Sequence, residues 1–230
     1  MTSTATKRSQ PSPAAEHGAA ARSPLAQLLH ALNQPLTGLQ CSMEVALAAP
    51  RTPEQYTRGL REGLELTERM RSLVEAIREV ADVEEEKNEN LEITELKTVL
   101  RETVDELKPV AEARKIRITL DCSETSSLAV RAGRRSMLGT VFRLLESALS
   151  LAARSGDLLI ETGSAPSQCW LRISWRLERP PSPFSRPELG LLIAQAGWER
   201  AGAAWQRERT ETSDTVTVRL PIISDARGPS

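Results

Sequence analysis

The strongest constraint on the fold is a row of apolar residues between positions 25 and 46 that recurs at alternating spacings of four and three. Its members are Leu25, Leu29, Leu32, Leu36, Leu39, Met43 and Ala46. This alternation is the heptad pattern of a helix that packs against other helices along one seam. Ser23 as N-cap and Pro24 in the first turn predict its start, and Ala49 with Pro50 predicts its end.

A second long helix is expected directly after a tight turn. Thr52 can cap it, Pro53 suits its first turn, and Gln55 completes a capping box. Its seam consists of Leu66, Met70, Leu73, Ile77 and Val80, widened by Leu60, Leu64, Thr67 and Val74. A single hairpin cannot cover so broad an apolar stripe. The pattern therefore predicts a homodimer in which two hairpins form a four-helix bundle.

The rest of the chain divides by texture. Residues 1–23 are small, polar and interrupted by proline, so we expect a disordered tail that includes His17. The hairpin spans 24–87, a mixed domain spans 91–222, and 223–230 form a second tail. Within the mixed domain, periodicity predicts helices at 94–113, 135–153 and 188–201, and strands at 116–120, 128–131, 158–162, 171–176, 203–209 and 215–220. The fold class is α+β: a helical hairpin followed by a two-layer α/β sandwich.

Composition excludes several classes of function. The chain has 30 Lys and Arg against 31 Asp and Glu, a net charge of −1, which argues against a nucleic-acid partner. No apolar run reaches the roughly 18 residues of a membrane span and no secretion signal is visible, so a cytoplasmic protein is expected. The three cysteines form no CxxC pair and there are only two histidines, so no metal site is predicted.

The segment His-Ala-Leu-Asn-Gln-Pro-Leu-Thr at 30–37 stands out within the first helix. His30 falls one step off the seam, where a partner protein can reach its ring. Pro35 removes the usual donor for the carbonyl of Ala31, which predicts a kink beside the histidine.

This segment, the hairpin and the α/β domain together resemble the dimerisation and phosphoacceptor region of two-component sensor histidine kinases. The resemblance covers about residues 24–222. It implies that His30 is the phosphoacceptor and that its motif neighbours Asn33 and Gln34 take part in the chemistry. By the same resemblance, Gln34 orients a water molecule or the phosphoaspartate of a partner.

The sequence departs from this family beside the histidine and at the two nucleotide positions of one helix. Ala31 stands where kinases carry a carboxylate, so no local general base is visible. In the helix at 138–148, Arg143 and Ser147 replace two asparagines, the second of which is a magnesium ligand. Glu146 next door is a possible substitute ligand, although an ordinary packing helix is the favoured interpretation.

The loop segments that hold nucleotide in the family are also degenerate. Leu177 stands near the place of the adenine-binding aspartate, and a Pro-rich stretch follows it. Of the glycine-rich lid only Gly190 remains, and Glu188 would repel a triphosphate. Close backbone approach to phosphate is therefore not expected, and no cofactor is assigned with confidence.

Three functions stay open at this stage. The favoured one is a phosphotransferase or pseudokinase in which His30 exchanges phosphoryl with the aspartate of a response-regulator receiver domain, which supplies its own Mg²⁺. The second is an active divergent kinase that autophosphorylates His30 from ATP. The third is a non-catalytic dimeric adaptor of a sensor kinase. The nearest enzyme class is protein-histidine kinase or histidine phosphotransferase.

Overall fold

The computed structural model describes residues 23–85, 92–122, 129–165 and 168–221, so the two predicted tails lie outside it except for Ser23. The helices are α1 (Pro24–Ala48), α2 (Pro53–Glu85), α3 (Leu96–Arg114), α4 (Arg134–Leu151) and α5 (Arg186–Arg200). The strands are β1 (Ile93–Glu95), β2 (Arg117–Cys122), β3 (Ala129–Arg131), β4 (Asp157–Ala165), β5 (Gln168–Arg176), β6 (Ala204–Arg209) and β7 (Ser213–Pro221).

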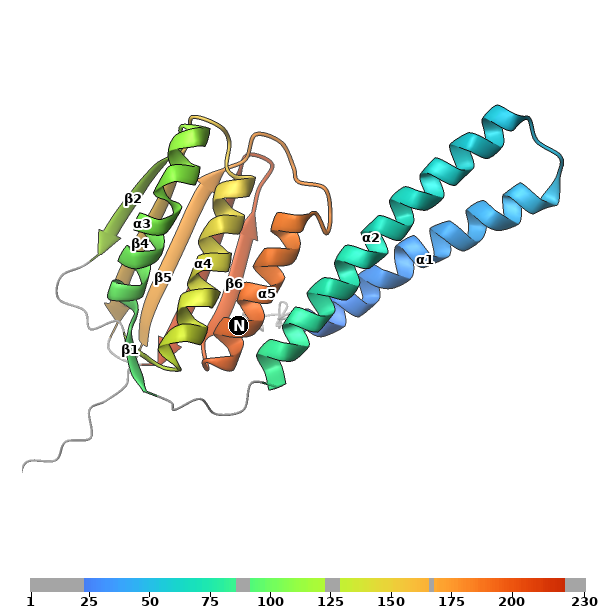
Figure 1. Cartoon of the computed structure of the whole chain (residues 1–230). Coiled ribbons are helices and arrows are strands. Elements are labelled where there is room, and N and C mark those ends of the chain that lie inside the picture. Colours follow the sequence, from blue (N-terminus) through green and yellow to red (C-terminus); the bar gives the residue numbers. More distant parts are fainter. Residues whose placement is uncertain (1–22, 86–91, 123–128, 166–167, 222–230) are drawn as a thin grey trace, which may run out of the picture.

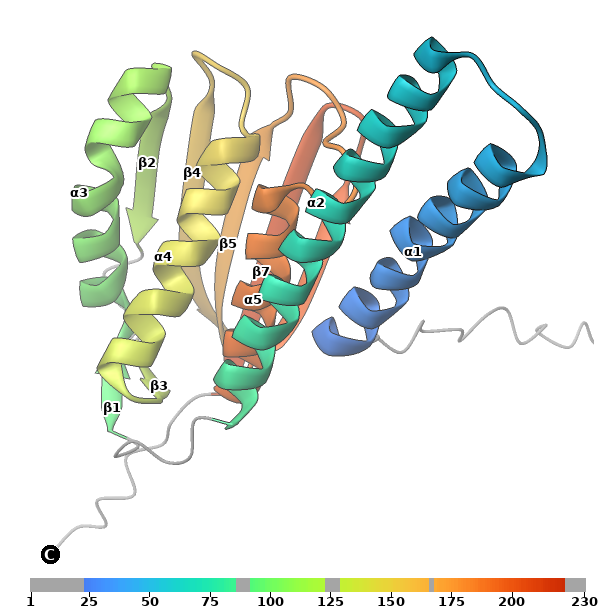
Figure 2. The same cartoon turned by 45° about the vertical axis from the view of Figure 1, so that its right-hand side comes forward.

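The α/β domain is a five-stranded sheet with three helices on one face (Figures 1 and 2). The strand order is β2-β4-β5-β7-β6, with β2 and β4 parallel and the other neighbours antiparallel. Alternate residues of β5 are buried under the helices, because successive side chains of a strand point to opposite faces. These residues join α3, α4 and α5 in one core.

The predicted fold class, a helical hairpin followed by a two-layer α/β domain, is confirmed. The helices and strands predicted between 94 and 220 are present, with ends shifted by a few residues. The sequence did not reveal β1, which pairs antiparallel with β3 from Ile93 opposite Arg131 to Glu95 opposite Ala129. A strand of three residues is too short to show a period.

The caps of the hairpin helices follow the sequence prediction. The hydroxyl of Ser23 accepts a hydrogen bond from the backbone N–H of Ala26 at 3.3 Å. At the start of α2, the Gln55 side chain accepts from the Thr52 N–H at 3.0 Å, and the Thr52 hydroxyl accepts from the Gln55 N–H at 3.3 Å. This reciprocal pair is a capping box. Helix α1 continues through Pro35 without interruption.

The buried face of α1 lies one position away from the predicted seam. Pro24, Leu28, Ala31 and Pro35 are buried in the chain. The seam residues are partly buried or exposed, and Leu29, Leu36 and Met43 are about half exposed. The predicted seam therefore runs along the edge of the face that the chain itself covers.

The buried face of α1 packs against α2, and α5 closes it near the first turns of α1 (Figure 2). A second apolar cluster joins the three helices and is separate from the main core. The hairpin contributes Leu28, Ala31, Leu73, Ala76 and Val80, and α5 contributes Leu189, Ile193 and Ala196. Helix α5 is thus buried on two sides, against the sheet and against the hairpin.

Helices α4 and α5 approach each other closely at two glycines of α5. A Cβ built on Gly190 would lie 2.2 Å from the Ser147 hydroxyl oxygen, and one on Gly197 would lie 2.4 Å from that of Thr140. Gly190 and Gly197 are seven residues apart on α5, and Thr140 and Ser147 are seven residues apart on α4. The two contacts therefore lie along one line between the helices. An added methyl group at either glycine would displace the side chain of Ser147 or of Thr140.

Candidate functional site

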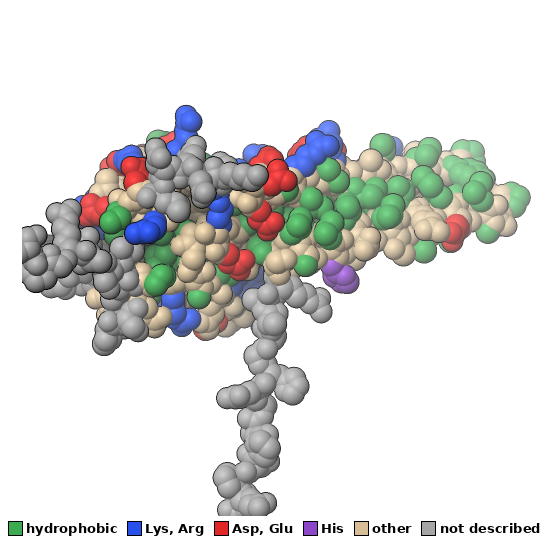
Figure 3. Space-filling view, turned by 90° about the horizontal axis from the view of Figure 1, so that it is seen from below, with side chains coloured by type: hydrophobic (Ala, Val, Ile, Leu, Met, Phe, Trp, Pro, Cys, Tyr) green, Lys and Arg blue, Asp and Glu red, His purple; other side chains and the backbone are tan. Residues whose placement is uncertain are grey.

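His30 lies on the exposed side of α1. Its side chain is exposed, as are those of Asn33, Gln34, Thr37 and Cys41. Residues 30, 34, 37 and 41 are spaced by four and three, so they follow one another along a single helix face. The histidine, purple in Figure 3, is accessible beside a band of hydrophobic side chains on the hairpin. A partner protein can therefore approach the ring and Gln34 together.

The residue after the histidine points the other way. Ala31 is only 1% exposed and belongs to the apolar cluster between the hairpin and α5. The sequence shows that no carboxylate stands there, and the structure gives a packing reason. An unpaired acid at position 31 would be buried among Leu28, Leu73 and the α5 residues, which is unfavourable by several kcal/mol.

The four positions that the kinase resemblance relates to nucleotide make other contacts. Arg143 forms an ion pair with Glu79 of α2, with 2.7 Å between Nη2 and Oε2. Ser147 is 4% exposed and faces Gly190 across the contact of α4 with α5. Two positions that the resemblance relates to nucleotide therefore lie against each other, and a methyl group on Gly190 would have to displace the Ser147 hydroxyl.

Leu177 is part of the core instead of a binding loop. It is buried, it bridges to Ala152, and its backbone N–H donates to the Thr212 carbonyl at 2.9 Å. The loop that follows leads directly into α5. Within it, the Pro183 carbonyl accepts a hydrogen bond from the Arg69 guanidinium of α2 at 2.9 Å.

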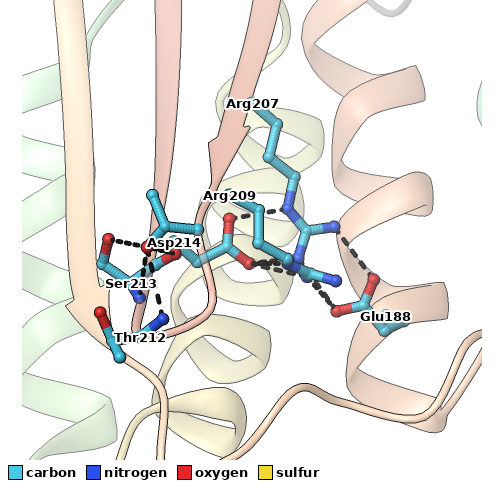
Figure 4. A network of polar contacts seen from close by, with 7 residues as sticks. Glu188, Arg207, Arg209, Thr212, Ser213 and Asp214 are labelled. Carbon is cyan, nitrogen blue, oxygen red and sulfur yellow. Dashed lines mark hydrogen bonds and ion pairs between the residues drawn. The ribbon is translucent and has the colours of Figure 1, made fainter.

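Glu188, in the first turn of α5, belongs to a network of four charged residues with Arg207, Arg209 and Asp214 of β6 and β7 (Figure 4). The Arg207 guanidinium donates to both oxygens of Asp214, at 2.6 and 3.0 Å, and to both oxygens of Glu188, at 2.9 and 3.1 Å. Arg209 also bonds both carboxylates. Asp214 is fully buried and Glu188 nearly so. The two cations are thus neutralised by the chain's own acids.

Burial dominates the electrostatics of this network. It raises the pKa of the Glu188 carboxyl and of the Asp214 carboxyl above their ordinary values, while the nearby charge of Arg209 opposes the rise. Burial also raises the pKa of the Cys169 thiol in the core. Neither guanidinium of the network is left with only water as a partner, so neither is a ready-made phosphate ligand.

Sequence reasoning identified Glu188 as an obstacle to nucleotide but missed its partners. Arg207 and Arg209 are two apart in β6 and therefore share one face of the strand, which is a period-two signal in the sequence. Asp214 lies opposite Arg209 in the register of β6 and β7. Only the pairing of the two strands brings these residues together.

Comparison with known proteins relates this architecture to solved structures. No protein-family model matches the sequence, and no curated protein matches it either. Histidine kinase AdeS of Acinetobacter baumannii is 19% identical, with a TM-score of 0.53 over 84% of this chain and 97% of that chain. Histidine kinase ThkA, solved in complex with response regulator protein TrrA, is 15% identical, with a TM-score of 0.56 over 88% of this chain and 62% of that chain.

A third structure, full-length ShkA in complex with AMPPNP, is 16% identical, with a TM-score of 0.52 over 87% of this chain and 46% of that chain. TM-scores above 0.5 over more than four fifths of this chain show a shared fold, and at these identities they show the fold alone. The chain has the fold of sensor histidine kinases, a helical hairpin followed by an ATPase-type α/β domain. Within the described ranges, no helix is long and apolar enough to cross a membrane.

Proposed function

We propose that this chain acts in two-component signalling by moving a phosphoryl group between His30 and the aspartate of a receiver domain, and that its ATP site is lost. One contrast carries the proposal. His30 is exposed, whereas Ser147 and Gly190 are packed against each other where the kinase resemblance expects a nucleotide. The phosphoacceptor histidine is retained, and the position expected for the nucleotide is occupied by the contact between α4 and α5.

The chemistry asks little of the chain. A lone pair on an unprotonated imidazole nitrogen of His30 attacks the phosphorus of an aspartyl phosphate, a nitrogen–phosphorus bond forms, and the bond from phosphorus to the carboxylate oxygen breaks. The aspartate leaves as its carboxylate, and the reverse step regenerates the aspartyl phosphate. Alignment and charge stabilisation dominate such transfers, and the receiver brings its own Mg²⁺. Gln34, exposed one turn along, is placed to orient the incoming group.

The proposed partner is a response-regulator receiver domain. ThkA, which shares this fold, was solved with the response regulator protein TrrA. In the present chain the exposed stripe of His30, Gln34 and Thr37 is free of α5, which packs on the opposite side of α1. A receiver can therefore reach the histidine without displacing the α/β domain.

A second copy of the chain is the proposed cover for the outer part of the hairpin. A groove of about 680 Å³ runs between α1 and α2 there, lined by residues that include Met43, Val45, Leu60 and Leu64. Figure 3 shows the hydrophobic band that continues along this part. Leu64 is 70% exposed and Leu36 is 52% exposed. A self-complementary apolar stripe of this kind is buried by a four-helix bundle.

The central test is transfer from phosphorylated receiver domains. The full chain is incubated with a panel of receivers that carry labelled phosphate, and acid-labile, base-stable label on the chain is measured. We expect labelling of the parent and of the control Cys41→Ser, and its loss in His30→Ala. Labelling of His30→Ala at the parental level, or no labelling of the parent by any receiver, contradicts the proposal and favours a non-catalytic adaptor.

Nucleotide binding tests the loss of the ATP site separately. Titration of the full chain with ATP and Mg²⁺ in a calorimeter is expected to give no saturable heat. Tight, magnesium-dependent binding together with label from ATP on His30 would instead identify an active, divergent kinase. That outcome removes the second half of the proposal and leaves the role of His30 intact.

A further inference from the structure

The contact between the hairpin and the α/β domain is built like a domain core. Eight residues of α1, α2 and α5 in the second apolar cluster are buried. None of them belongs to the main core of the α/β domain. They are Leu28, Ala31, Leu73, Ala76, Val80, Leu189, Ile193 and Ala196. All eight side chains are apolar and buried, and a hydrophobic contact between two domains opposes the relative motion that a polar contact allows.

A short segment before α5 adds a second attachment. Phe184 packs against the same cluster, and the neighbouring Pro183 carbonyl is hydrogen-bonded by Arg69 of α2. The backbone of Phe184 has φ of 56°, the left-handed region that residues with a side chain rarely adopt. Such a conformation persists where surrounding contacts enforce it. Pro183 and Phe184 therefore fasten the end of this loop to the hairpin.

Polar contacts at the far end of the interface point the same way. Arg143 of α4 is ion-paired with Glu79 of α2, the residue directly before Val80. In the first turn of α5, Glu188 is held by Arg207 and Arg209 of β6. Helix α5 is thus fixed to the sheet by its first turn, to α4 at its two glycines, and to the hairpin along its apolar side.

We infer that the α/β domain is locked on the hairpin and that His30 exchanges phosphoryl without any rotation of this domain. The inference deepens the proposed function and rests on it for the phosphoryl step. An enzyme that carried ATP to His30 would have to move its nucleotide domain to the histidine and away again. Here the α/β domain stays packed against the hairpin instead of moving. It therefore forms a fixed part of the surface around α1.

The lock itself is tested by distances between spin labels, with no reference to phosphorylation. Labels are placed at the exposed positions Glu65→Cys of α2 and Glu112→Cys of α3, in a background of Cys41→Ser and Cys122→Ser, and labelled chains are diluted with unlabelled protein. One narrow distance peak is expected, unchanged by ATP. A broad or two-peaked distribution in the parent overturns the inference.

A loosened variant shows which contacts are responsible. Phe184→Ala with Ile193→Ala removes side chains that pack only in the second cluster, so the α/β core is expected to stay folded, as checked by the fluorescence of the buried Trp175 and Trp198. We expect the distance peak to broaden. The matched control Arg71→Ala, on the exposed side of α2, should leave it narrow. An unbroadened peak in the loosened variant overturns the assignment of the lock to this cluster.

The consequence for transfer is tested by a crosslink across the interface. Glu79→Cys and Arg143→Cys, in the same cysteine background, are joined by a short bismaleimide. The rate of His30 labelling by a phosphorylated receiver should stay within about two-fold of the unlinked protein. A loss of roughly tenfold or more shows that the domain must move and overturns the inference. Absence of labelling before crosslinking contradicts the proposed function instead, while the spin-label result still judges the lock.

Discussion

The two halves of the hairpin carry the same apolar repeat but bury it in different ways. In the inner half, residues 24–35 and 69–83, the apolar face is covered by α5 of the same chain. In the outer half, residues 36–48 and 53–68, large side chains such as Met43 and Leu60 stay exposed among the described residues. The face of the inner half that packs against α5 is thus buried within one chain, whereas the outer half keeps an exposed apolar stripe, which the proposed second copy would cover.

This difference explains why the histidine motif departs from the kinase pattern where it does. His30 and Ala31 are adjacent on the inner half, about 100° apart around the helix. One faces solvent and the other faces α5. A substitution at position 31 alters the contact with the α/β domain, whereas a substitution on the exposed histidine side of the helix does not. The packing of α5 against α1 therefore accounts for the residue at position 31, and the chemistry of the histidine does not.

The strongest way to break the inner half is to restore the acid of the kinase motif. Ala31→Glu should place an unpaired carboxylate in the cluster and lower the free energy of unfolding by roughly 3–5 kcal/mol, measured by urea denaturation. The matched control Asn33→Glu adds the same charge at an exposed position and should change stability by less than about 0.5 kcal/mol. Equal effects of the two variants would contradict the burial of residue 31.

The sequence predicts the helical hairpin and the α/β domain, but it does not predict which part of the hairpin the α/β domain covers. The heptad repeat from Leu25 to Ala46 gave the hairpin, and alternation gave the long strands. The buried face of α1 was misplaced by one position, because leucines at both 28 and 29 fit a helical period. Which of them is buried depends on α5, more than 150 residues away in the chain.

One available signal for the packing of α5 against the hairpin was overlooked. The segment from Leu189 to Trp198 is apolar or small on nearly every side, and a helix that is apolar all round must be buried on more than one face. The paired spacing of Thr140 with Ser147 and of Gly190 with Gly197 likewise indicates a close helix contact. The charged network of Asp214 left no comparable signal, since strand pairing brings Asp214 to the two arginines and the packing of α5 adds Glu188.

We expect that the dimer contact of the outer half can be disrupted while α5 stays packed against the inner half. Leu36→Glu with Leu64→Glu places charges on the exposed stripe, where a second copy would bury them. The dissociation constant of the homodimer should rise by at least 100-fold, about 2.7 kcal/mol, because desolvating unpaired charge is unfavourable. Light scattering over a dilution series measures it, and narrow spin-label distances show that α5 stays seated. An unchanged molecular mass in the variant argues against the bundle.

A substitution with a smaller expected effect tests the contact between α4 and α5, which positions α5 against the inner half of the hairpin. Gly190→Ala should force the added methyl group against the Ser147 hydroxyl and lower the free energy of unfolding by about 1–3 kcal/mol. Adding Ser147→Ala to it removes the clashing oxygen and should restore most of the loss. Gly139→Ala on α4 meets nothing within 4 Å and is expected to stabilise the protein by about 0.5–1 kcal/mol.

If Gly190→Ala proved harmless while Gly139→Ala behaved as expected, α4 and α5 would not touch along this line. The space between Ser147 and Gly190 would then be open to a ligand, and the argument for a lost nucleotide site would fail. Thermal denaturation of the three variants under one set of conditions decides between these results.

The smallest expected effect concerns the ion pair between Glu79 and Arg143, which joins the inner half to α4. Both side chains are more than a third exposed, so water and salt screen their attraction and the coupling energy should be only about 0.2–1 kcal/mol. A double-mutant cycle with Glu79→Gln and Arg143→Gln, followed by urea denaturation, measures it. The pair of Glu68 and Arg71, which lies within α2, is the reference. A Glu79–Arg143 coupling of the same size as the reference means that the apolar cluster holds the α/β domain on the hairpin, whereas a coupling above roughly 2 kcal/mol would transfer that role to the ion pair.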